Sequence, residues 1–336
     1  MIHKGERNLI TDVAGVRVGQ AEDVAARTGV TVLLGDAPMM AAVDIRGGAP
    51  GTRDVLGLDS VPLVETVDAV VLSGGSAFGL DASSGVQAWL RERERGFRIA
   101  PDLPPVPIVS GAIIFDLANG GNKEWGEEPP YRRLGKRATG ASDLDFALGN
   151  AGAGLGALAG TYKGGLGSAS SISDDGFTVG ALVVVNSVGS PVMPGMDAFW
   201  AYPFEQDGEF GGRAPKGPVR AGLDFPPDMK GAVRPAANTT IAIVATDAEL
   251  TTLELRRIAM MAADGFARAL RPVHTPFDGD LVYVVSTARH APPQPRPLAV
   301  MRLGHMAADC LARAIARGVY EAETLGAFKS YRDTFP

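Results

Sequence analysis

The sequence of 336 residues contains one cysteine, Cys310, and four histidines. A single cysteine excludes an internal disulfide framework and any metal site built from several cysteines. His, Asp and Glu form no cluster at ligand spacing, so we expect no protein-bound metal. No Gly-x-Ser-x-Gly motif and no Ser-x-x-Lys spacing occurs either, which removes the usual signatures of a serine hydrolase. A Ser-His-Asp triad assembled from distant residues stays open as an alternative.

Long apolar runs are also absent. No uninterrupted apolar stretch approaches the roughly 20 residues that a membrane helix requires, and residues 1–7 lack the apolar core of a signal peptide. We therefore expect a cytoplasmic protein without a membrane partner. The net charge of −6 disfavours a nucleic-acid or anionic-membrane surface as the main partner.

Glycine, in contrast, is abundant: the 43 glycines are nearly twice the usual share of about 7%. They separate apolar, strand-like runs, as tight turns and close backbone approaches require. Strands buried on both faces, with helical patterns between them, predict a layered α/β sandwich. The expected strands lie near residues 16–19, 29–34, 39–45, 69–72, 106–116, 161–163, 177–186, 239–246 and 281–287, and the clearest helical patterns cover 251–270 and 298–323.

Two glycine-rich loops, residues 73–79 and 152–156, could present backbone N–H groups to an anion. The first lacks the Gly-Lys-Ser/Thr ending of a P-loop, and the second lacks the full dinucleotide-binding spacing. Structural turns are therefore the preferred interpretation of both loops.

The junction at Asn238 and Thr239 suggests a specific chemistry. A loop of residues 191–238, which holds eight of the 24 prolines, ends there at a strand whose first residue carries a hydroxyl. If the bond before Thr239 breaks, this hydroxyl and a new α-amine lie on one residue. An α-amine has a reference pKa of about 8, so it can take the hydroxyl proton without any histidine. A Thr-Thr pair that merely favours β structure is the alternative interpretation.

Separated motifs occur in a fixed order along nearly the whole chain: Asn8–Val13, Val43–Thr52, Leu72–Leu80, Val184–Asn186, Asn238–Ile241 and His274–Asp280. In these motifs the sequence resembles the P1 family of peptidases, related to the L-aminopeptidase D-amidase/D-esterase. Relatives of that family include β-peptidyl aminopeptidases and the nylon-oligomer hydrolase. They carry Ser or Thr as nucleophile, and this chain is similar to the Thr branch.

The resemblance implies one αββα sandwich over residues 1–336. Its four layers would be like those of N-terminal-nucleophile hydrolases, with the connectivity of the aminopeptidase and ornithine acetyltransferase type. It also implies self-cleavage between Asn238 and Thr239 into an α chain of residues 1–238 and a β chain of residues 239–336. The two chains would stay associated, and the family forms homo-oligomers of such αβ units, often tetramers.

The resemblance also implies roles for individual residues. Thr239 matches the nucleophile, its amine matches the base, and Asn186 matches a side chain that donates an N–H to the tetrahedral oxyanion. Lys163 matches a lysine whose charge keeps the Thr239 amine deprotonated, with a plain strand-end lysine as the alternative. Asp278 and Asp280 match an acidic pair that orients the Thr239 amine and hydroxyl, with an ordinary Asp-Gly-Asp turn as the alternative.

Two residues expected near the substrate depart from the pattern. Relatives often place a tyrosine near the reacting carbonyl where this chain has Phe115, so one oxyanion donor is lost. Asp116 is a weak substitute for the glutamate that binds a substrate amine in some β-peptidyl enzymes. These departures leave the substrate and its L, D or β preference open.

The expected activity is that of an aminopeptidase that hydrolyses short peptides, amino-acid amides or esters through an acyl-enzyme, with no cofactor. Hydrolysis of ω-amino-acid oligomers, as in nylon degradation, is an alternative within the same family. Acyl transfer to an amine, like that of ornithine acetyltransferase, is a second alternative. An uncleaved homologue that binds small molecules without chemistry is the third.

Overall fold

The computed structural model describes residues 2–59, 63–219, 228–230 and 238–336. Its strands are β1 (Ile2–Lys4), β2 (Val16–Asp23), β3 (Thr28–Ile45), β4 (Thr52–Arg53), β5 (Thr66–Ser73), β6 (Val109–Ile113), β7 (Leu158–Ala159), β8 (Tyr162–Lys163), β9 (Gly165–Ser173), β10 (Thr178–Asn186), β11 (Thr239–Ala248) and β12 (Leu281–His290). Its α-helices are α1 (Leu56–Asp59), α2 (Ala82–Arg91), α3 (Tyr131–Gly140), α4 (Thr252–Ala262), α5 (Asp264–Ala269), α6 (Arg296–Tyr320) and α7 (Tyr331–Thr334). Within these described ranges, no helix combines the length and the apolar character needed to cross a membrane.

Ten strands form one continuous sheet in the order β1-β9-β10-β11-β12-β3-β5-β6-β4, with β2 also paired to β3. The long strand β3 joins the two halves of this sheet. Its residues 30–34 pair with β5, and its residues 40–45 pair with β12. The register with β5 shifts between Leu34 and Met39, and Met39 and Met40 then pair with β5 again, as at a β-bulge or similar irregularity.

Side chains of the strands alternate between two buried faces, because successive residues of a strand point in opposite directions. In β10, Leu182 and Val184 join a core cluster with residues of β5 and β6, so this cluster lies between the two halves of the sheet. Val183 and Val185 of the same strand join a second cluster with residues of α4, α5 and α6. A third cluster lies between the β3 and β5 half and the helices α2 and α3.

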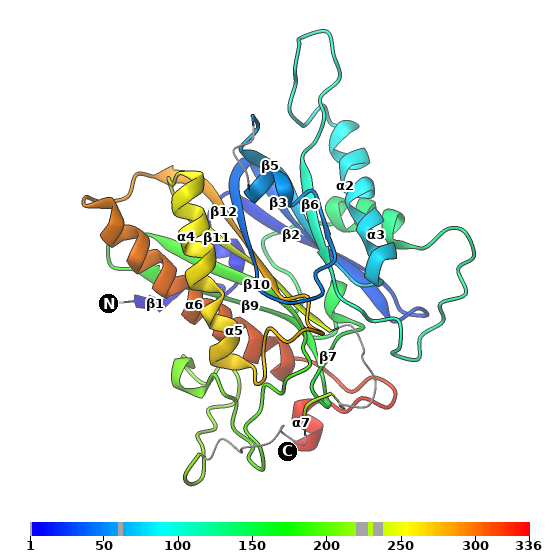
Figure 1. Cartoon of the computed structure of the whole chain (residues 1–336), viewed down its shortest axis with the longest axis vertical. Helices are drawn as coiled ribbons and strands as arrows, with labels where there is room; N and C mark the ends of the chain where they lie inside the picture. The colour runs from blue at the N-terminus through cyan, green and yellow to red at the C-terminus, as the bar shows by residue number, and fades with distance from the viewer. Residues whose placement is uncertain (1, 60–62, 220–227, 231–237) are drawn as a thin grey trace.

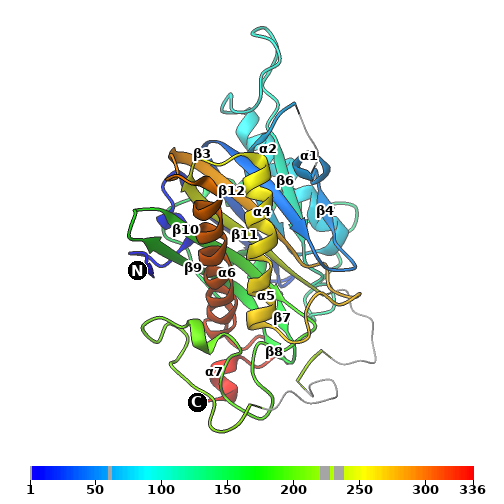
Figure 2. The same ribbon diagram turned by 60° about the vertical axis from the view of Figure 1, so that its left-hand side comes forward.

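These three clusters separate four layers. The helices α4, α5 and α6 cover one half of the sheet, and α2 and α3 cover the other half, on opposite sides of the molecule (Figure 1). Figure 2 shows α4 and α6 lying across the strands β10, β11 and β12. The predicted αββα sandwich is confirmed.

Three predicted boundaries were wrong. Segments 29–34 and 39–45 were expected as two strands, but they belong to the single strand β3, whose connecting residues stay bonded: Asp36 N–H donates to the Gly15 carbonyl at 2.8 Å. The predicted strand 106–116 is reduced to β6, and the predicted helix 251–270 divides into α4 and α5 at Ala263. The local sequence pattern shows where such elements occur, but strand pairing and packing in the folded chain determine where they begin and end.

The start of α4 follows its sequence signal. Thr251 Oγ1 accepts a hydrogen bond from the Glu254 N–H at 3.3 Å, and the Glu254 carboxylate accepts one from the Thr251 N–H at 2.9 Å. This capping box satisfies backbone donors that the first turn of a helix would otherwise leave unpaired. The helix then buries Leu255 completely against the sheet and leaves Leu253 79% exposed.

This contrast predicts unequal effects of two substitutions on one helix. Leu255→Ala should lower the free energy of unfolding by about 2–5 kcal/mol, because it removes buried methyl groups and leaves a cavity. Leu253→Ala should change it by less than about 0.5 kcal/mol. Urea unfolding followed by circular dichroism measures both variants, and equal losses would contradict the assignment of the buried face of α4.

Candidate active site

The strand β11 begins at Thr239, directly opposite Asn186 at the end of β10. Both residues are almost fully buried, with exposed fractions of 2% and 1%. Because side chains alternate along a strand, Thr239 points to the same face as Ile241, and Asn186 points to the same face as Val184. Ile241 and Val184 both lie in the layer between the sheet halves. Opposite residues of an antiparallel pair have Cβ atoms about 4.5–5.5 Å apart, so the Thr239 and Asn186 side chains are neighbours at the end of this layer.

The carbonyl of the Asn238–Thr239 peptide bond has a fixed hydrogen-bond donor. The Gly279 N–H donates to the Asn238 carbonyl oxygen at 2.8 Å, and the Asn238 N–H donates to the Phe277 carbonyl at 2.9 Å. The Thr239 hydroxyl contacts the same Asn238 oxygen. A backbone N–H in this position is the type of donor that stabilises negative charge developing on a carbonyl oxygen.

Glycine at position 279 is required by close packing. A Cβ atom there would lie 2.8 Å from Thr239 Oγ1 and 2.6 Å from the Ala49 carbonyl oxygen. A Cβ atom at Gly47 would lie 2.3 Å from the Asp278 carbonyl oxygen, and the Ala49 N–H donates to that oxygen at 2.9 Å. The motif at 43–52 therefore packs tightly against the turn that carries Gly279.

Asp278 lies on this turn, and its buried carboxylate binds groups other than Thr239. Its Oδ1 accepts from the Val188 N–H at 3.1 Å, and its Oδ2 accepts from the Thr275 hydroxyl at 2.6 Å. Burial, followed by the nearby charge of Asp280, raises the pKa of this carboxyl above its usual value.

Asp280 is hydrogen-bonded to Thr240, the residue after the predicted nucleophile Thr239. Its Oδ1 accepts from the Thr240 N–H at 2.8 Å, and its Oδ2 lies 2.9 Å from His274 Nδ1. Both acids thus lie beside the predicted centre and fix the backbone around it. Their predicted role in orienting the Thr239 amine and hydroxyl stays a prediction.

Lys163 is buried in the two-stranded hairpin of β7 and β8. Its ammonium donates to the carbonyl oxygens of Gly164 at 2.7 Å and Gly154 at 3.0 Å. Burial lowers the pKa of Lys163 to about 7, and the charge of Asp116 opposes this shift. The hairpin adjoins the Asn186 side chain, whose Oδ1 accepts from the Leu158 N–H at 3.0 Å.

Phe115 and Asp116 are both close to this region, and their predicted role in substrate binding stays a prediction. The Phe115 carbonyl oxygen, rather than its ring, accepts from Asn186 Nδ2 at 3.2 Å. The buried Asp116 carboxylate accepts from the Gly75 N–H at 2.7 Å and from the Thr28 hydroxyl at 2.5 Å. These bonds hold the glycine-rich loop 73–79 against the sheet and fit its interpretation as a structural turn. Burial raises the pKa of Asp116.

Two groups at the site were not predicted from the sequence. One is the Gly279 N–H, because the Asp-Gly-Asp motif suggests a turn but not a hydrogen-bond donor. The other is Lys230, whose ammonium donates to Asn186 Oδ1 at 3.0 Å. Lys230 lies in a segment without periodicity, so no sequence pattern marks it. Among the residues that the structure describes, no group of three or more His, Cys, Asp or Glu side chains is arranged to hold a metal ion.

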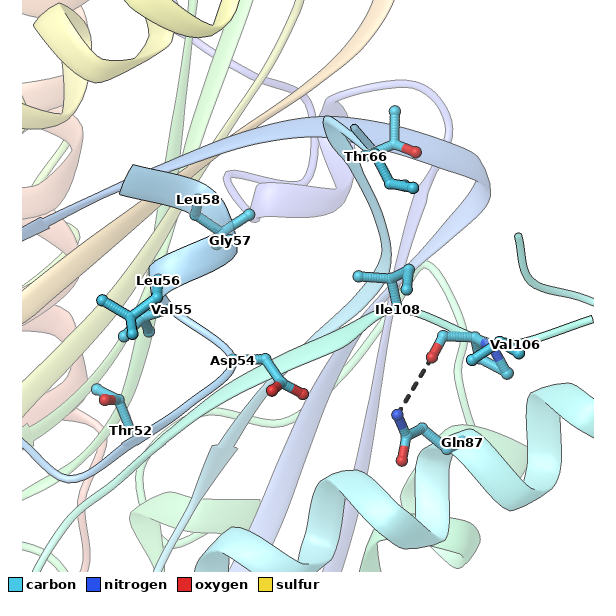
Figure 3. A pocket seen from close by; sticks show the side chains of 12 residues that line it. Thr52, Asp54, Val55, Leu56, Gly57, Leu58, Thr66, Gln87, Val106 and Ile108 are labelled. Atoms are coloured by element: carbon cyan, nitrogen blue, oxygen red, sulfur yellow. Dashed lines mark hydrogen bonds between the residues drawn. The ribbon is translucent and has the colours of Figure 1, made fainter. Parts of the chain in front are cut away.

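A hollow of about 650 Å³ lies at the edge of the sheet beside β4 and β6 (Figure 3). Apolar side chains such as Val55 and Ile108 line most of it, and Asp54 and Gln87 add polar groups. None of the predicted catalytic residues lines this hollow. It is therefore separate from the Thr239 centre.

Solved structures with the same arrangement define the class of fold. The L-aminopeptidase D-Ala-esterase/amidase of Ochrobactrum anthropi, described as a variant of the N-terminal-nucleophile-hydrolase fold, superposes with a TM-score of 0.70 at 22% identity, over 96% of this chain and 89% of that one. A β-aminopeptidase of a Burkholderia species gives a TM-score of 0.69 at 23% identity, over 97% and 90% of the two chains. The chain thus has the fold of these N-terminal-nucleophile-type aminopeptidases.

The chain belongs to peptidase family S58, whose sequence model matches residues 8–332. A protein of Mycobacterium tuberculosis described as an uncharacterized aminopeptidase is 44% identical over 98% of both chains. A 6-aminohexanoate-oligomer endohydrolase of a Kocuria species is 32% identical over 84% of this chain and 76% of its own length. The predicted family resemblance is confirmed, and these matches support a peptidase or amidase.

The lowered pKa of Lys163 predicts how stability depends on pH. Between its folded pKa of about 7 and its ordinary value of 10.5, Lys163 binds fewer protons in the folded chain than in the unfolded chain. The free energy of unfolding should therefore rise with pH across this window, by up to about 1.4 kcal/mol per pH unit for one lysine. Lys163→Met should remove this part of the slope.

The measurement is urea unfolding at pH 7, 8 and 9 of two chains that both carry Thr239→Ala, which removes the hydroxyl of the predicted nucleophile. One chain has Lys163 and the other has Met at that position. The difference between the two slopes therefore reports Lys163 together with its smaller effect on Lys230, whose pKa the charge of Lys163 lowers. Parallel slopes would contradict a buried lysine that loses its proton near neutral pH.

Proposed function

We propose that this chain cleaves its own backbone between Asn238 and Thr239 and then acts as an amide hydrolase with Thr239 as nucleophile. The geometry around the Asn238 carbonyl is the observation that carries this proposal. Its oxygen is bound to the Gly279 N–H at 2.8 Å and contacts the Thr239 hydroxyl. The nucleophile, the bond to be broken and an oxyanion donor are thus together before any cleavage.

In the first reaction, Thr239 Oγ attacks the carbonyl carbon of Asn238. The oxyanion that forms lies on the Gly279 N–H, and removal of such a donor typically costs about 3–4 kcal/mol of barrier. The hydroxyl proton passes to the departing nitrogen, the C–N bond breaks, and an ester joins Asn238 to Thr239 Oγ. Water hydrolyses this ester, which leaves a carboxylate on Asn238 and a free amine on Thr239.

The two pieces would remain one folded unit after the cut. The β chain of residues 239–336 supplies β11 and β12, which lie between β10 and β3 of the α chain in the middle of the sheet. It also supplies Arg313, which is fully buried and donates to Glu209 at 2.6 Å and to Asn8 at 2.8 Å. Separation would expose central strands and break a buried ion pair, which is strongly unfavourable.

In the mature enzyme the Thr239 amine would serve as the general base. It accepts the hydroxyl proton as Oγ attacks the substrate carbonyl, and it passes this proton to the leaving amine. The substrate oxyanion would lie near Asn186 Nδ2, which has two N–H groups and uses one for the Phe115 carbonyl at 3.2 Å. Water then releases the acyl group through the same base.

The substrate class that we favour is the amino-terminal end of a short peptide, or an amino-acid amide or ester. The relatives at 44% identity are described as aminopeptidases, which supports this class. The relatives named 6-aminohexanoate-oligomer endohydrolases are 32% identical, so ω-amino-acid oligomers are the second candidate. Homo-oligomeric αβ units and a cytoplasmic location remain part of the proposal.

Self-cleavage predicts two polypeptides from one gene product. The purified wild-type chain should migrate on a denaturing gel as fragments 1–238 and 239–336, and mass spectrometry should find Thr239 at the new amino terminus. Thr239→Ala should give one intact band, because it lacks the attacking oxygen. Thr239→Ser restores a hydroxyl and should restore cleavage. Two bands from Thr239→Ala would refute self-cleavage by this residue.

A substrate panel tests the second half of the proposal. The processed protein should release p-nitroaniline from amino-acid p-nitroanilides. Asn186→Ala, assayed only on protein that has been processed, should lower kcat by about 10²–10³-fold. Faster turnover of 6-aminohexanoate oligomers would favour the second candidate. Turnover that requires an added amino-acid acceptor would favour acyl transfer instead, and an intact protein without any turnover would favour a binding role.

A further inference from the structure

The Asn186 amide is held at both ends by partners of opposite kind. Its Oδ1 accepts from the Leu158 N–H at 3.0 Å and from the Lys230 ammonium at 3.0 Å, and its Nδ2 donates to the Phe115 carbonyl at 3.2 Å. A rotation of the amide by 180° would turn Nδ2 toward two donors and Oδ1 toward a carbonyl oxygen. All three hydrogen bonds would be lost, so the partners select one orientation.

Lys230 contributes the charged partner in this arrangement. A hydrogen bond from an ionised donor is roughly twice as strong as one between neutral groups. The ammonium also withdraws electron density from the amide oxygen, which strengthens the N–H groups on the other side of the amide. The Lys230 backbone N–H donates to the Val188 carbonyl at 2.9 Å, so the side chain extends from an anchored backbone.

We propose that Lys230 is a positioning residue for the reactions at Thr239: its ammonium holds the oxygen of the Asn186 amide, so that the nitrogen faces the bond between Asn238 and Thr239. This inference rests on the proposed function. It gives the reaction a charged group that belongs to the α chain and lies eight residues before the cut. The group acts through Asn186 and touches no reacting atom.

Two described charged groups act on Lys230, and they come from different elements. Lys163 lies on the hairpin of β7 and β8, and Asp278 lies on the turn before β12. Burial, and then the like charge of Lys163, lower the pKa of Lys230 to about 7, and Asp278 opposes this shift. The ammonium is therefore present below about pH 7 and is lost above it. If its charge orients Asn186, the rate of self-cleavage gains a component that falls as the pH rises through 7.

The test follows self-cleavage of labelled chains made by cell-free translation and chased at pH values from 6 to 9, with both fragments resolved on a denaturing gel. Lys230→Met should slow cleavage by about 10²-fold, because a misplaced catalytic group costs about that factor. Lys230→Arg keeps a cation at every pH, so it should recover most of the wild-type rate at pH 6 and lose the fall above pH 7. Lys230→Gln, which keeps an N–H donor without charge, should resemble the methionine variant.

Lys216→Met is the matched control. Lys216 lies in the same proline-rich segment, and its side chain is 80% exposed on a surface ion pair with Asp197. Its loss should leave the cleavage rate within about 2-fold of wild type, because exposed ion pairs contribute little. Circular dichroism melts of the purified variants show whether each one folds.

The outcomes separate this inference from the proposed function. A wild-type chain that never cleaves refutes the proposed function itself. A cleaving wild type with Lys230→Met within about 3-fold of its rate refutes the role of Lys230 alone. That role is equally refuted if folded Lys230→Arg is as slow as Lys230→Met, or if its rate still falls above pH 7, since the falling component then belongs to Lys163 or another group.

Discussion

The register of three neighbouring strands is the constraint on which this site depends. Antiparallel pairing of β10 with β11 sets Asn186 opposite Thr239. Parallel pairing of β11 with β12 sets Ile241 beside Leu281, and the same alignment continues outward to the bridge between Asn238 and Asp278. A slip of one residue would turn every side chain to the other face. The buried side chains of the inter-sheet core therefore fix the reacting groups as firmly as they fix the fold.

Much of this arrangement was predictable from the sequence, because local pattern and short motifs mark it. Alternation identified β11, strand-like apolar runs identified β10 and β12, and Thr251 with Glu254 identified the start of α4. Thr239 stood out because a strand begins with a hydroxyl at the end of a proline-rich loop. The roles proposed for Asn186 and Lys163 came from family resemblance rather than from spacing.

Other features were not predictable, because they arise only when distant segments meet. The continuous strand β3 depends on its two different partners, β5 and β12. The local sequence pattern indicates an interruption of the strand at residues 35–38. The Gly279 donor is a backbone N–H, and the residue type does not show that this group acts as a donor at the site. The side chain of Phe115 was expected near the substrate, whereas the contact with Asn186 is made by the Phe115 carbonyl oxygen. Lys230 belongs to a segment whose composition indicates only a loop.

The charges around Thr239 explain how an amine could replace histidine as the base. Lys163 is fully buried and Lys230 is partly buried, and this loss of hydration lowers the pKa of each to about 7. A further positive charge on a new Thr239 amine would add like charge to the same buried region. Like charge of this kind would favour the neutral form of that amine.

The oxygens of Asp278 and Asp280 accept hydrogen bonds from Val188, Thr275, Thr240 and His274, so both carboxylates have fixed positions near Thr239. Burial, and then the charge of Asp280, raise the pKa of Asp278 above its usual value. A group that must accept a proton near neutral pH has to be neutral before the reaction, and nearby like charge favours that form. In the proposed reaction, Lys163 and Lys230 would thus help a chain terminus to act as the base.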